Sequence, residues 1–543
     1  MIAETVIRNG RVITMARDEA HGYAQALAIS QGRLLAVGAG EEIEALVGAS
    51  TQVLDVGGRA VLPGFIDTHV HLTLTGLGAL GPSLYGVRSA DEALEFIARQ
   101  AASAAEGEVI VVYGAAFGEL DHPLAFEQYD RVTPRNPLLV SDIGCHACAL
   151  NGVAWQELNL PAGMPGLVRD PFTGKPNGVL LGPANTRARF HFLNRIDDAT
   201  RAAALHEAAQ MALRVGITTV HALEGGTADG HGWLGERDVD VLLQEQSRLP
   251  VRTVVYFQTT DVSRVQKLGL PRIGGCLYVD GAYGEHTAAL REPYTDEPTT
   301  SGMLYFSDEE LRGFVSRAHK AGLQISMHAI GDAAIEQLLG AYEHALLEEP
   351  RADHRHRIEH FSLPTARQIE AAARLGVAVA MQPNFAYVPP EGQNDDQIAG
   401  LAMLGPARYR RRHPYRRILA AGVLVAGGSD SDAKPFGPLF GIHALVNHPD
   451  EDRRLSAHEA LSLYTADAAR IAFEEKDKGT IEAGKLADLV VLVEDPLRVC
   501  PNRLRDIPVA MTMIGGEVAY THPGWRLPST PEDRARGGAL PVA

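Results

Sequence analysis

The chain has 543 residues, of which 45% are hydrophobic and 22% are charged, and its formal net charge is −17 at pH 7. This composition is typical of globular proteins, and the length predicts two or more folding units because it exceeds one ordinary core. The acidic charge, without any basic block, argues against nucleic acid as a partner.

Neither a signal peptide nor a membrane span is predicted. The N-terminus has no basic region followed by an apolar one, and no apolar run approaches the roughly 20 residues that span a bilayer. The chain has 4 cysteines, too few for a disulfide framework, and the C-x-x-C of Cys145 and Cys148 is interpreted as two ordinary thiols. We therefore predict a cytoplasmic protein without a membrane partner.

Short strands are predicted at both ends of the chain. Residues 5–8 and 11–14 flank Asn9-Gly10, a strong hairpin signal, and the apolar run 489–493 has the same strand character near the C-terminus. The two β-rich ends predict one small β-sandwich closed by both termini. Its predicted limits are 1–57 and 477–525, followed by a tail at 526–543.

Apolar strands and amphipathic helices alternate in the middle of the chain, residues 58–476, as is typical of parallel βα units. Helices are predicted over 308–321 and 365–375, among others. Eight strands with intervening helices predict the α/β class and a (β/α)8 TIM barrel, whose sites lie at the C-terminal ends of the strands. The predicted strands are 61–67, 217–222, 251–257, 276–280, 324–329, 356–361, 377–382 and 423–428.

The span between the first two barrel strands is far longer than a normal βα loop. It contains a predicted helix at 90–105 and predicted strands at 109–112 and 138–140. We therefore predict an inserted subdomain at about residues 73–210 that covers the mouth of the barrel.

A His-x-His pair, His69 and His71, ends the first barrel strand after the run Pro63-Gly64-Phe65-Ile66-Asp67. Side chains in an extended strand repeat every two residues, so both imidazoles leave the same face. Two neutral imidazole nitrogens side by side are half of a tetrahedral site for zinc or a similar metal. The pair therefore predicts a metal site, completed from the ends of other strands.

Three further strand ends carry residues of the metal-ligand type, namely His328, His360 and Asp430. Singly, each histidine could be a hydrogen-bonded core residue, and Asp430 could be a helix N-cap. Together, at successive strand ends of one barrel, they indicate a metal centre.

The motifs P-G-F-I-D-T-H-V-H-L, M-H-A-I-G-D, R-I-E-H and G-G-S-D resemble those of the amidohydrolase superfamily of metal-dependent hydrolases. The segments 279–282, 287–290, 178–181 and 144–151 are similar to its YtcJ-like branch, also called amidohydrolase 3. The resemblance extends over nearly the whole chain. It implies the barrel-plus-sandwich fold, a divalent metal and hydrolysis of amide or other C–N bonds.

The resemblance also implies the roles of particular residues. Carried over by position, His69, His71, His328 and His360 become metal ligands, with one or two ions, zinc being the expected one. Asp430 becomes a ligand that also takes a proton from water, and we group His360 with it as catalytic. Neutral imidazoles leave the charge of the cation uncancelled, so that water bound to it reaches a pKa near about 7.

One position departs from the family pattern. Relatives commonly have a carboxylated lysine where this chain has Cys276. A thiol cannot carry a carbamate, but a thiolate can bind or bridge zinc directly, so we include Cys276 among the predicted ligands. The alternative is a small buried apolar residue beside a site for one metal.

Three residues are predicted to bind substrate. The family pattern puts His146 of the inserted subdomain over the metal pocket, where it could polarise a carbonyl; a surface histidine is the alternative. Tyr283 is a further candidate of this kind. His286 stands in a segment, Gly284 to Thr287, where relatives more often have a serine and an arginine.

The leading prediction is thus a metal-dependent hydrolase of an amide or other C–N bond in a small molecule, with Asp430 as general base. Two alternatives remain open. One is an ester hydrolase, lyase or isomerase with the same metal, since a fold does not determine chemistry. The other is a binding or regulatory protein with a degenerate site. A homodimer is expected only from the family.

Overall fold

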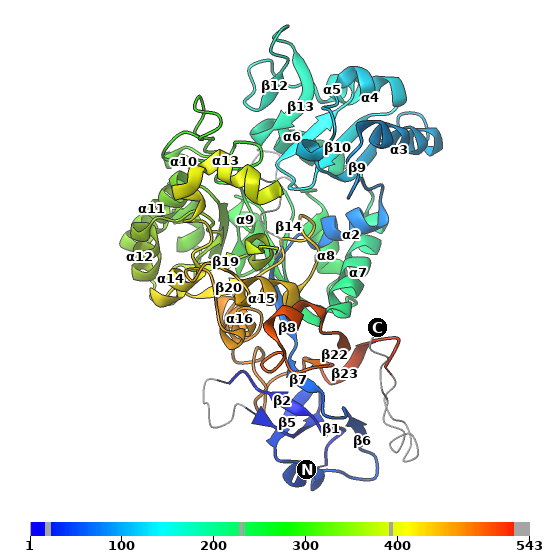
Figure 1. Ribbon diagram of the computed structural model, residues 1–543, viewed down its shortest axis with the longest axis vertical. Helices are drawn as coiled ribbons and strands as arrows, with labels where there is room; N and C mark the ends of the chain where they lie inside the picture. Colours follow the sequence, from blue (N-terminus) through cyan, green and yellow to red (C-terminus); the bar gives the residue numbers. More distant parts are fainter. Residues whose placement is uncertain (1, 17–22, 227–231, 233, 390–394, 526–543) are drawn as a thin grey trace.

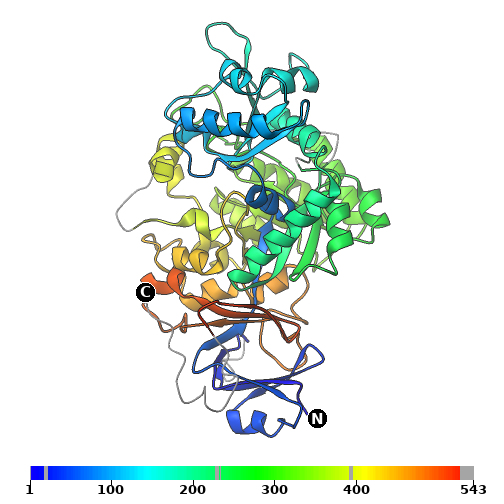
Figure 2. The same ribbon diagram turned by 90° about the vertical axis from the view of Figure 1, so that its right-hand side faces the viewer.

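The computed structural model describes residues 2–16, 23–226, 232, 234–389 and 395–525, and the predicted tail at 526–543 lies outside these ranges. A barrel occupies the middle of the molecule, between a β-rich part built from both termini and an inserted α/β part (Figure 1). Figure 2 shows the same order along the long axis. Among the described residues, we find no helix with the length and apolar character that crossing a membrane requires.

The barrel is an eight-stranded parallel sheet in the order β20-β19-β18-β17-β16-β15-β14-β8. Its first and last strands meet, because the amide of His71 donates to the carbonyl of Ser431 at 2.8 Å and the amide of Asp430 donates to that of His69 at 3.0 Å. The predicted (β/α)8 barrel is therefore confirmed. The strands are β8 Phe65–Val70, β14 Ile217–Glu224, β15 Arg252–Phe257, β16 Arg272–Ile273, β17 Gln324–Ala329, β18 Arg357–His360, β19 Ala378–Met381 and β20 Val425–Gly427.

Two of the predicted barrel strands need correction. The strand predicted over 61–67 is divided, because Ala60–Pro63 (β7) pairs within the terminal sheets and the barrel strand β8 begins only at Phe65. The strand predicted over 276–280 is wrong, since the fourth barrel strand is the short β16 at Arg272–Ile273. Gly274 and Gly275, both at positive φ, end that strand.

Helices surround the barrel, and capping explains where two of the predicted ones begin. Ser307 and Thr365 accept hydrogen bonds from the amides of Glu310 and Gln368 in capping boxes. Each helix therefore begins at the residue after its cap, α10 at Asp308 and α12 at Ala366. The helices between and around the strands are α2 Leu72–Leu80, α7 Asp198–Arg214, α8 Asp238–Glu245, α9 Val262–Lys267, α10 Asp308–Lys320, α11 Asp332–Glu348, α12 Ala366–Leu375, α13 Asp395–Tyr409, α14 Tyr415–Ala420, α15 Pro438–Val446, α16 Ala457–Ser462 and α17 Ala466–Ile471.

The β-rich part combines strands from both termini in two sheets, β5-β4-β1-β6 and β23-β22-β21-β7-β2-β3. Leu27, Val61 and Val491 are fully buried in a common apolar cluster, so the two ends of the chain share one core. The strands are β1 Thr5–Arg8, β2 Arg11–Ile13, β3 Tyr23–Ala24, β4 Ala26–Ser30, β5 Arg33–Gly38, β6 Gln52–Asp55, β7 Ala60–Pro63, β21 Leu489–Leu492, β22 Val509–Ile514 and β23 Glu517–Thr521.

The span between the first two barrel strands forms its own five-stranded sheet in the order β12-β13-β11-β10-β9. It lies at the end of the molecule opposite the terminal sheets (Figures 1 and 2). Its elements are α3 Ala90–Ser103, β9 Ile110–Ala115, α4 Phe126–Val132, β10 Leu138–Asp142, β11 Ala147–Leu150, α5 Gly152–Leu158, β12 Leu167–Arg169, β13 Pro176–Leu181 and α6 Gly182–Leu193.

Candidate metal centre

His69 and His71 are buried at the C-terminal end of β8, and each has one ring nitrogen engaged by the protein. His69 Nδ1 lies 2.6 Å from Glu359 Oε2, and His71 Nδ1 lies 3.0 Å from the carbonyl oxygen of Leu223. The two Nε2 atoms are therefore directed to the same place, 3.1 Å and 3.6 Å from Asp430 Oδ1. Fixing one nitrogen in this way orients the other as a metal ligand.

His328 and His360 end β17 and β18, and their ring centroids are 4.6 Å apart. His328 is fully buried, with Nδ1 3.3 Å from the carboxylate of Asp280. That carboxylate also accepts hydrogen bonds from three backbone amides, those of Ala289, Ile330 and Gly331. Asp280 is thus fixed by the backbone and can orient His328.

Asp430 reaches the site through the G-G-S-D segment at the end of β20. A Cβ atom on Gly428 would lie 2.7 Å from the backbone nitrogen of His69, so only glycine permits this approach. Both Asp430 and His360 have left-handed backbone conformations, with φ of 60° and 68°. Such non-glycine conformations are costly and are concentrated at functional sites.

The charge of His69 also controls the acidity of Asp430. Burial raises the pKa of Asp430, but the neighbouring positive charge of His69 outweighs burial and holds that pKa well below its usual value. The carboxylate is therefore ionised, as a metal ligand or a proton acceptor must be.

Cys276 follows the turn at Gly274 and Gly275 and is buried among the histidines. Its Sγ and one ring nitrogen each of His69 and His360 lie within 4.8 Å of one another. Burial raises the pKa of the thiol, but the charge of His69 and hydrogen bonds with His360, His69 and His71 lower it to about 6. A thiolate is thus accessible near neutral pH.

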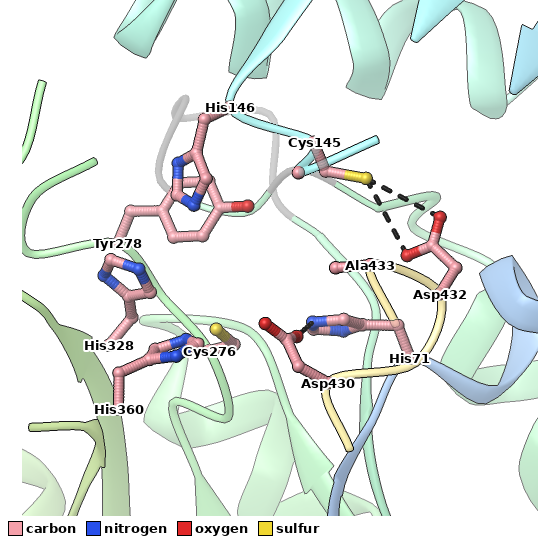
Figure 3. Close-up of a pocket in the computed structure, with 11 residues that line it drawn as sticks. His71, Cys145, His146, Cys276, Tyr278, His328, His360, Asp430, Asp432 and Ala433 are labelled. Atoms are coloured by element: carbon pink, nitrogen blue, oxygen red, sulfur yellow. Dashed lines mark hydrogen bonds and ion pairs between the residues drawn. The ribbon is translucent and has the colours of Figure 1, made fainter. Parts of the chain in front are cut away.

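Five of these six side chains form two overlapping groups that fit a divalent cation, and His328 belongs to neither group. The first is His69, Cys276 and His360, and the second is His69, His71 and Asp430. His328 Nε2 is buried and has no hydrogen-bond partner among the described residues, which a metal would supply. Imidazole, thiolate and carboxylate are the donor set of zinc. Figure 3 shows Cys276, His360, His71 and Asp430 directed toward the same space.

Of the three predicted substrate-binding residues, His146 and Tyr283 lie at the site. The ring of His146 stacks on that of Tyr278 at 4.6 Å, above His328 (Figure 3). Both His146 and Tyr283 line a cavity of about 690 Å³ that also reaches His360 and Asp430.

His286 is not brought to this cavity. Its Nε2 lies 3.0 Å from Asp296, and its ring packs against Tyr294. The turn at positive φ directs His286 away, while its neighbour Glu285 lines the cavity.

Sequence reasoning missed the buried ion pair beside the ligands. Arg357 and Glu359 are both fully buried inside the barrel, and the guanidinium Nε of Arg357 contacts Glu359 Oε1. The signal was present in R-I-E-H, because alternate residues of a strand share a face and Arg357 and Glu359 alternate. Two charged residues on one face of an apolar strand indicate a functional network.

A closed parallel barrel with imidazole, thiol and carboxylate groups at the C-terminal ends of its strands is the architecture of a metal-dependent hydrolase. The amidohydrolase family model matches residues 52–520 of this chain. The chain belongs to that family and is a metal-dependent hydrolase.

The chain is 28% identical to the amidohydrolase YtcJ of Bacillus subtilis, over 91% of this chain and 96% of the relative. It is also 28% identical to the N-substituted formamide deformylase of Arthrobacter pascens, over 96% of this chain and 99% of the relative. A solved structure, an uncharacterised metal-dependent hydrolase of Pyrococcus furiosus, superposes with a TM-score of 0.71 at 27% identity, covering 91% and 100% of the two chains.

Proposed function

We propose that the protein hydrolyses an amide or another carbon–nitrogen bond of a small molecule, with Asp430 as the general base. The observation that carries this proposal is the position of Asp430 Oδ1, 3.1 Å and 3.6 Å from the ligand-type nitrogens of His69 and His71. The same carboxylate lines the large cavity, so a substrate in that cavity can reach it.

The residues that would hold the metal are His69, His71, His328, His360, Cys276 and Asp430. We expect zinc, because its preferred ligands are imidazole, thiolate and carboxylate. When bound, a divalent cation supplies Lewis acidity that makes water reactive at neutral pH. Because there are two overlapping groups of ligands, the proposal includes either one or two ions.

Asp430 and the residues around the ligands have distinct roles in the proposed reaction. Asp430 accepts the proton of the attacking water and later returns it to the leaving amine. His146 can donate a hydrogen bond to the substrate carbonyl as negative charge develops on its oxygen. Glu359 and Asp280 keep His69 and His328 in their orientations. Tyr283 contributes to the wall that binds the substrate.

The names of two of the relatives support a C–N bond as the target. One relative carries the name of an amidohydrolase, and another that of an N-substituted formamide deformylase. The donor set at the strand ends here suits the same class of reaction.

The test is a substrate panel on the zinc-loaded protein. The panel holds N-formyl and N-acetyl amines, carbamates and cyclic amides, together with the matched esters. We expect amide hydrolysis that disappears after chelation and returns with zinc, the chelated protein being the control. Turnover of the esters alone would favour ester hydrolysis as the reaction. Turnover of neither the amides nor the esters would contradict the proposal.

A further inference from the structure

The cavity of about 690 Å³ adjoins the metal centre, because the small pocket at the ligands and this cavity share His146, His360 and Asp430. Its volume is that of a site for a ligand of drug-like size. Aromatic side chains supply much of its wall, namely Tyr85, Tyr283, Phe385, Tyr387, Tyr409, Phe436 and Phe440.

One charged group of this wall, Arg412, has no anionic partner among the described residues. Its guanidinium lies 5.6 Å from the ring centre of Tyr283 and 5.0 Å from that of Tyr409, so it has cation–π contacts with two aromatic rings. In the part of the chain that the structure describes, no carboxylate lies within ion-pair distance of Arg412, and its side chain donates no hydrogen bond. Its donors are therefore available to a ligand in the cavity.

Neighbouring arginines of the same segment are used differently. Arg411 pairs with Asp332 at 2.9 Å, and Arg408 donates to Thr295 and to the carbonyls of Leu404 and Glu292. Both therefore support the fold, whereas Arg412 does not. A Cβ atom on Gly400 would lie 2.5 Å from Nη1 of Arg412, so this glycine leaves space for the guanidinium.

A second cation adds to the positive potential beside Arg412. Arg453 also lines the cavity, is only 8% exposed, and donates from Nη2 to the carbonyl of Tyr409 at 2.9 Å. Its nearest carboxylate, that of Asp450, is 3.8 Å away. Of the two guanidinium groups beside Tyr409, only that of Arg453 therefore has a described carboxylate within ion-pair distance.

The acidic residues of the cavity do not cancel this potential. Burial, followed by the charge of Asp142, raises the pKa of Glu285 to about 8, so Glu285 is largely neutral at pH 7. The carboxylate of Asp142 accepts hydrogen bonds from the backbone amides of Gly144 and Phe117. Neither is within ion-pair distance of Arg412.

We propose that Arg412 binds a carboxylate of the substrate, so that the enzyme acts on the C–N bond of an aromatic or apolar acid. This inference rests on the proposed function. The scissile bond would lie at His360 and Asp430, and the carboxylate would lie at the aromatic part of the cavity. The edge of a planar guanidinium presents parallel N–H donors, and that edge matches the two oxygens of a carboxylate.

Binding of aryl acids tests the proposal without requiring turnover. We would measure the affinity of zinc-loaded protein for 3-phenylpropanoate, its carboxamide and 2-phenylethylphosphonate by calorimetry. Wild type should prefer the carboxylate to the carboxamide by about tenfold or more, as expected for a charge-assisted pair. Arg412→Gln should lose this preference. Equal affinity for acid and amide, a preference for the phosphonate, or no binding of any of them would overturn the inference.

The matched control is Arg410→Gln, which removes the same charge from an exposed residue that does not line the cavity. It should retain the preference of wild type, and a loss equal to that of Arg412→Gln would show a general charge effect and reject the proposal. Measurements of hydrolysis distinguish failure of the carboxylate inference from failure of the proposed function. N-acetylphenylalanine, as both enantiomers, should be cleaved with a lower KM than its carboxamide. If both are cleaved equally, only the carboxylate inference fails; if the broad amide panel gives no turnover, the proposed function fails.

Discussion

Glu359 and His69 are joined by a contact of 2.6 Å between Oε2 and Nδ1, and both side chains are fully buried. The other oxygen of Glu359 contacts Ser326 Oγ and Arg357 Nε. Burial raises the pKa of Glu359, but the charge of Arg357 and the contact with His69 lower it to about 2. The carboxylate of Glu359 is therefore fixed against Nδ1 of His69, the imidazole that belongs to both groups of candidate ligands.

Replacing Glu359 with glutamine should weaken zinc binding by about 10- to 100-fold, because the imidazole of His69 loses its charged support. The measurement is zinc affinity by competition with a chromophoric chelator. Glu370→Gln, on the exposed face of α12, is the control and should bind zinc as wild type does. Unchanged affinity in Glu359→Gln would mean that the contact does not support the metal.

Replacing His69 and His71 together with alanine should abolish tight zinc binding, because two ligands are lost at once. Metal analysis after dialysis checks this, with circular dichroism to show that the fold remains. Full zinc occupancy in the double variant would reject the proposed site.

Asp430→Asn should lower turnover by orders of magnitude while keeping the fold, since an amide of nearly the same shape cannot accept a proton from water. The readout is kcat on the best substrate of the panel, with zinc content measured in parallel. A loss within about tenfold, or about 1.4 kcal/mol, would assign the base to another group.

Cys276→Ser should weaken or empty one metal position. With cobalt in place of zinc, wild type should show thiolate-to-metal charge-transfer absorption, and the serine variant should not. Cys500→Ser is the matched control, because Cys500 is an exposed free thiol. A metal–sulfur distance beyond about 3 Å in a zinc-bound structure, instead of about 2.3 Å, would exclude Cys276 as a ligand.

Acid should destabilise the protein through a histidine cluster at the start of the barrel strands. His356 is fully buried, and burial holds its pKa well below the usual value. Its Nδ1 accepts from the amide of Ile325 at 3.0 Å, and its Nε2 lies 2.8 Å from His319 and 3.3 Å from Arg351. Protonation of Nδ1 would break the first bond, so the native state keeps the ring neutral.

The direction in which pH changes the stability follows from the lowered pKa of His356. The unfolded chain takes up a proton at His356 below pH of about 6.5, whereas the native chain does not, so stability is full above that pH and falls below it. The slope for one such group is about 1.4 kcal/mol per pH unit. His356→Asn should reduce the slope of unfolding free energy against pH between 5 and 6, and surface variant His344→Asn should not. Parallel wild-type and His356→Asn profiles would contradict this.

The parts of the site that follow strand periodicity could be predicted. His69, His71, His328 and His360 end apolar strands, and strand ends meet at one mouth of a barrel, so their convergence needed no further information. Asp430 was predictable for the same reason, although its left-handed backbone was not.

The remaining features depend on contacts between distant segments. Cys276 reaches the site through the turn at Gly274 and Gly275 rather than along a strand, and His286 is drawn away by Asp296. Both outcomes depend on loop geometry, for which periodicity carries no signal. The lack of a carboxylate beside Arg412 among the described residues could not be predicted either, because sequence alone does not show which arginines pair with a carboxylate.

The closure of the barrel between β8 and β20 has a consequence for how the enzyme becomes active during synthesis. The proposed ligands His69 and Asp430 come from the first and last barrel strands, and their backbones are hydrogen-bonded directly. Before β20 has emerged from the ribosome, the nascent chain therefore lacks Asp430 and has an open barrel edge. The emerging polypeptide can form neither the complete set of proposed ligands nor the proposed proton acceptor until β20 has joined β8. We therefore expect hydrolytic activity only after β20 has closed the barrel.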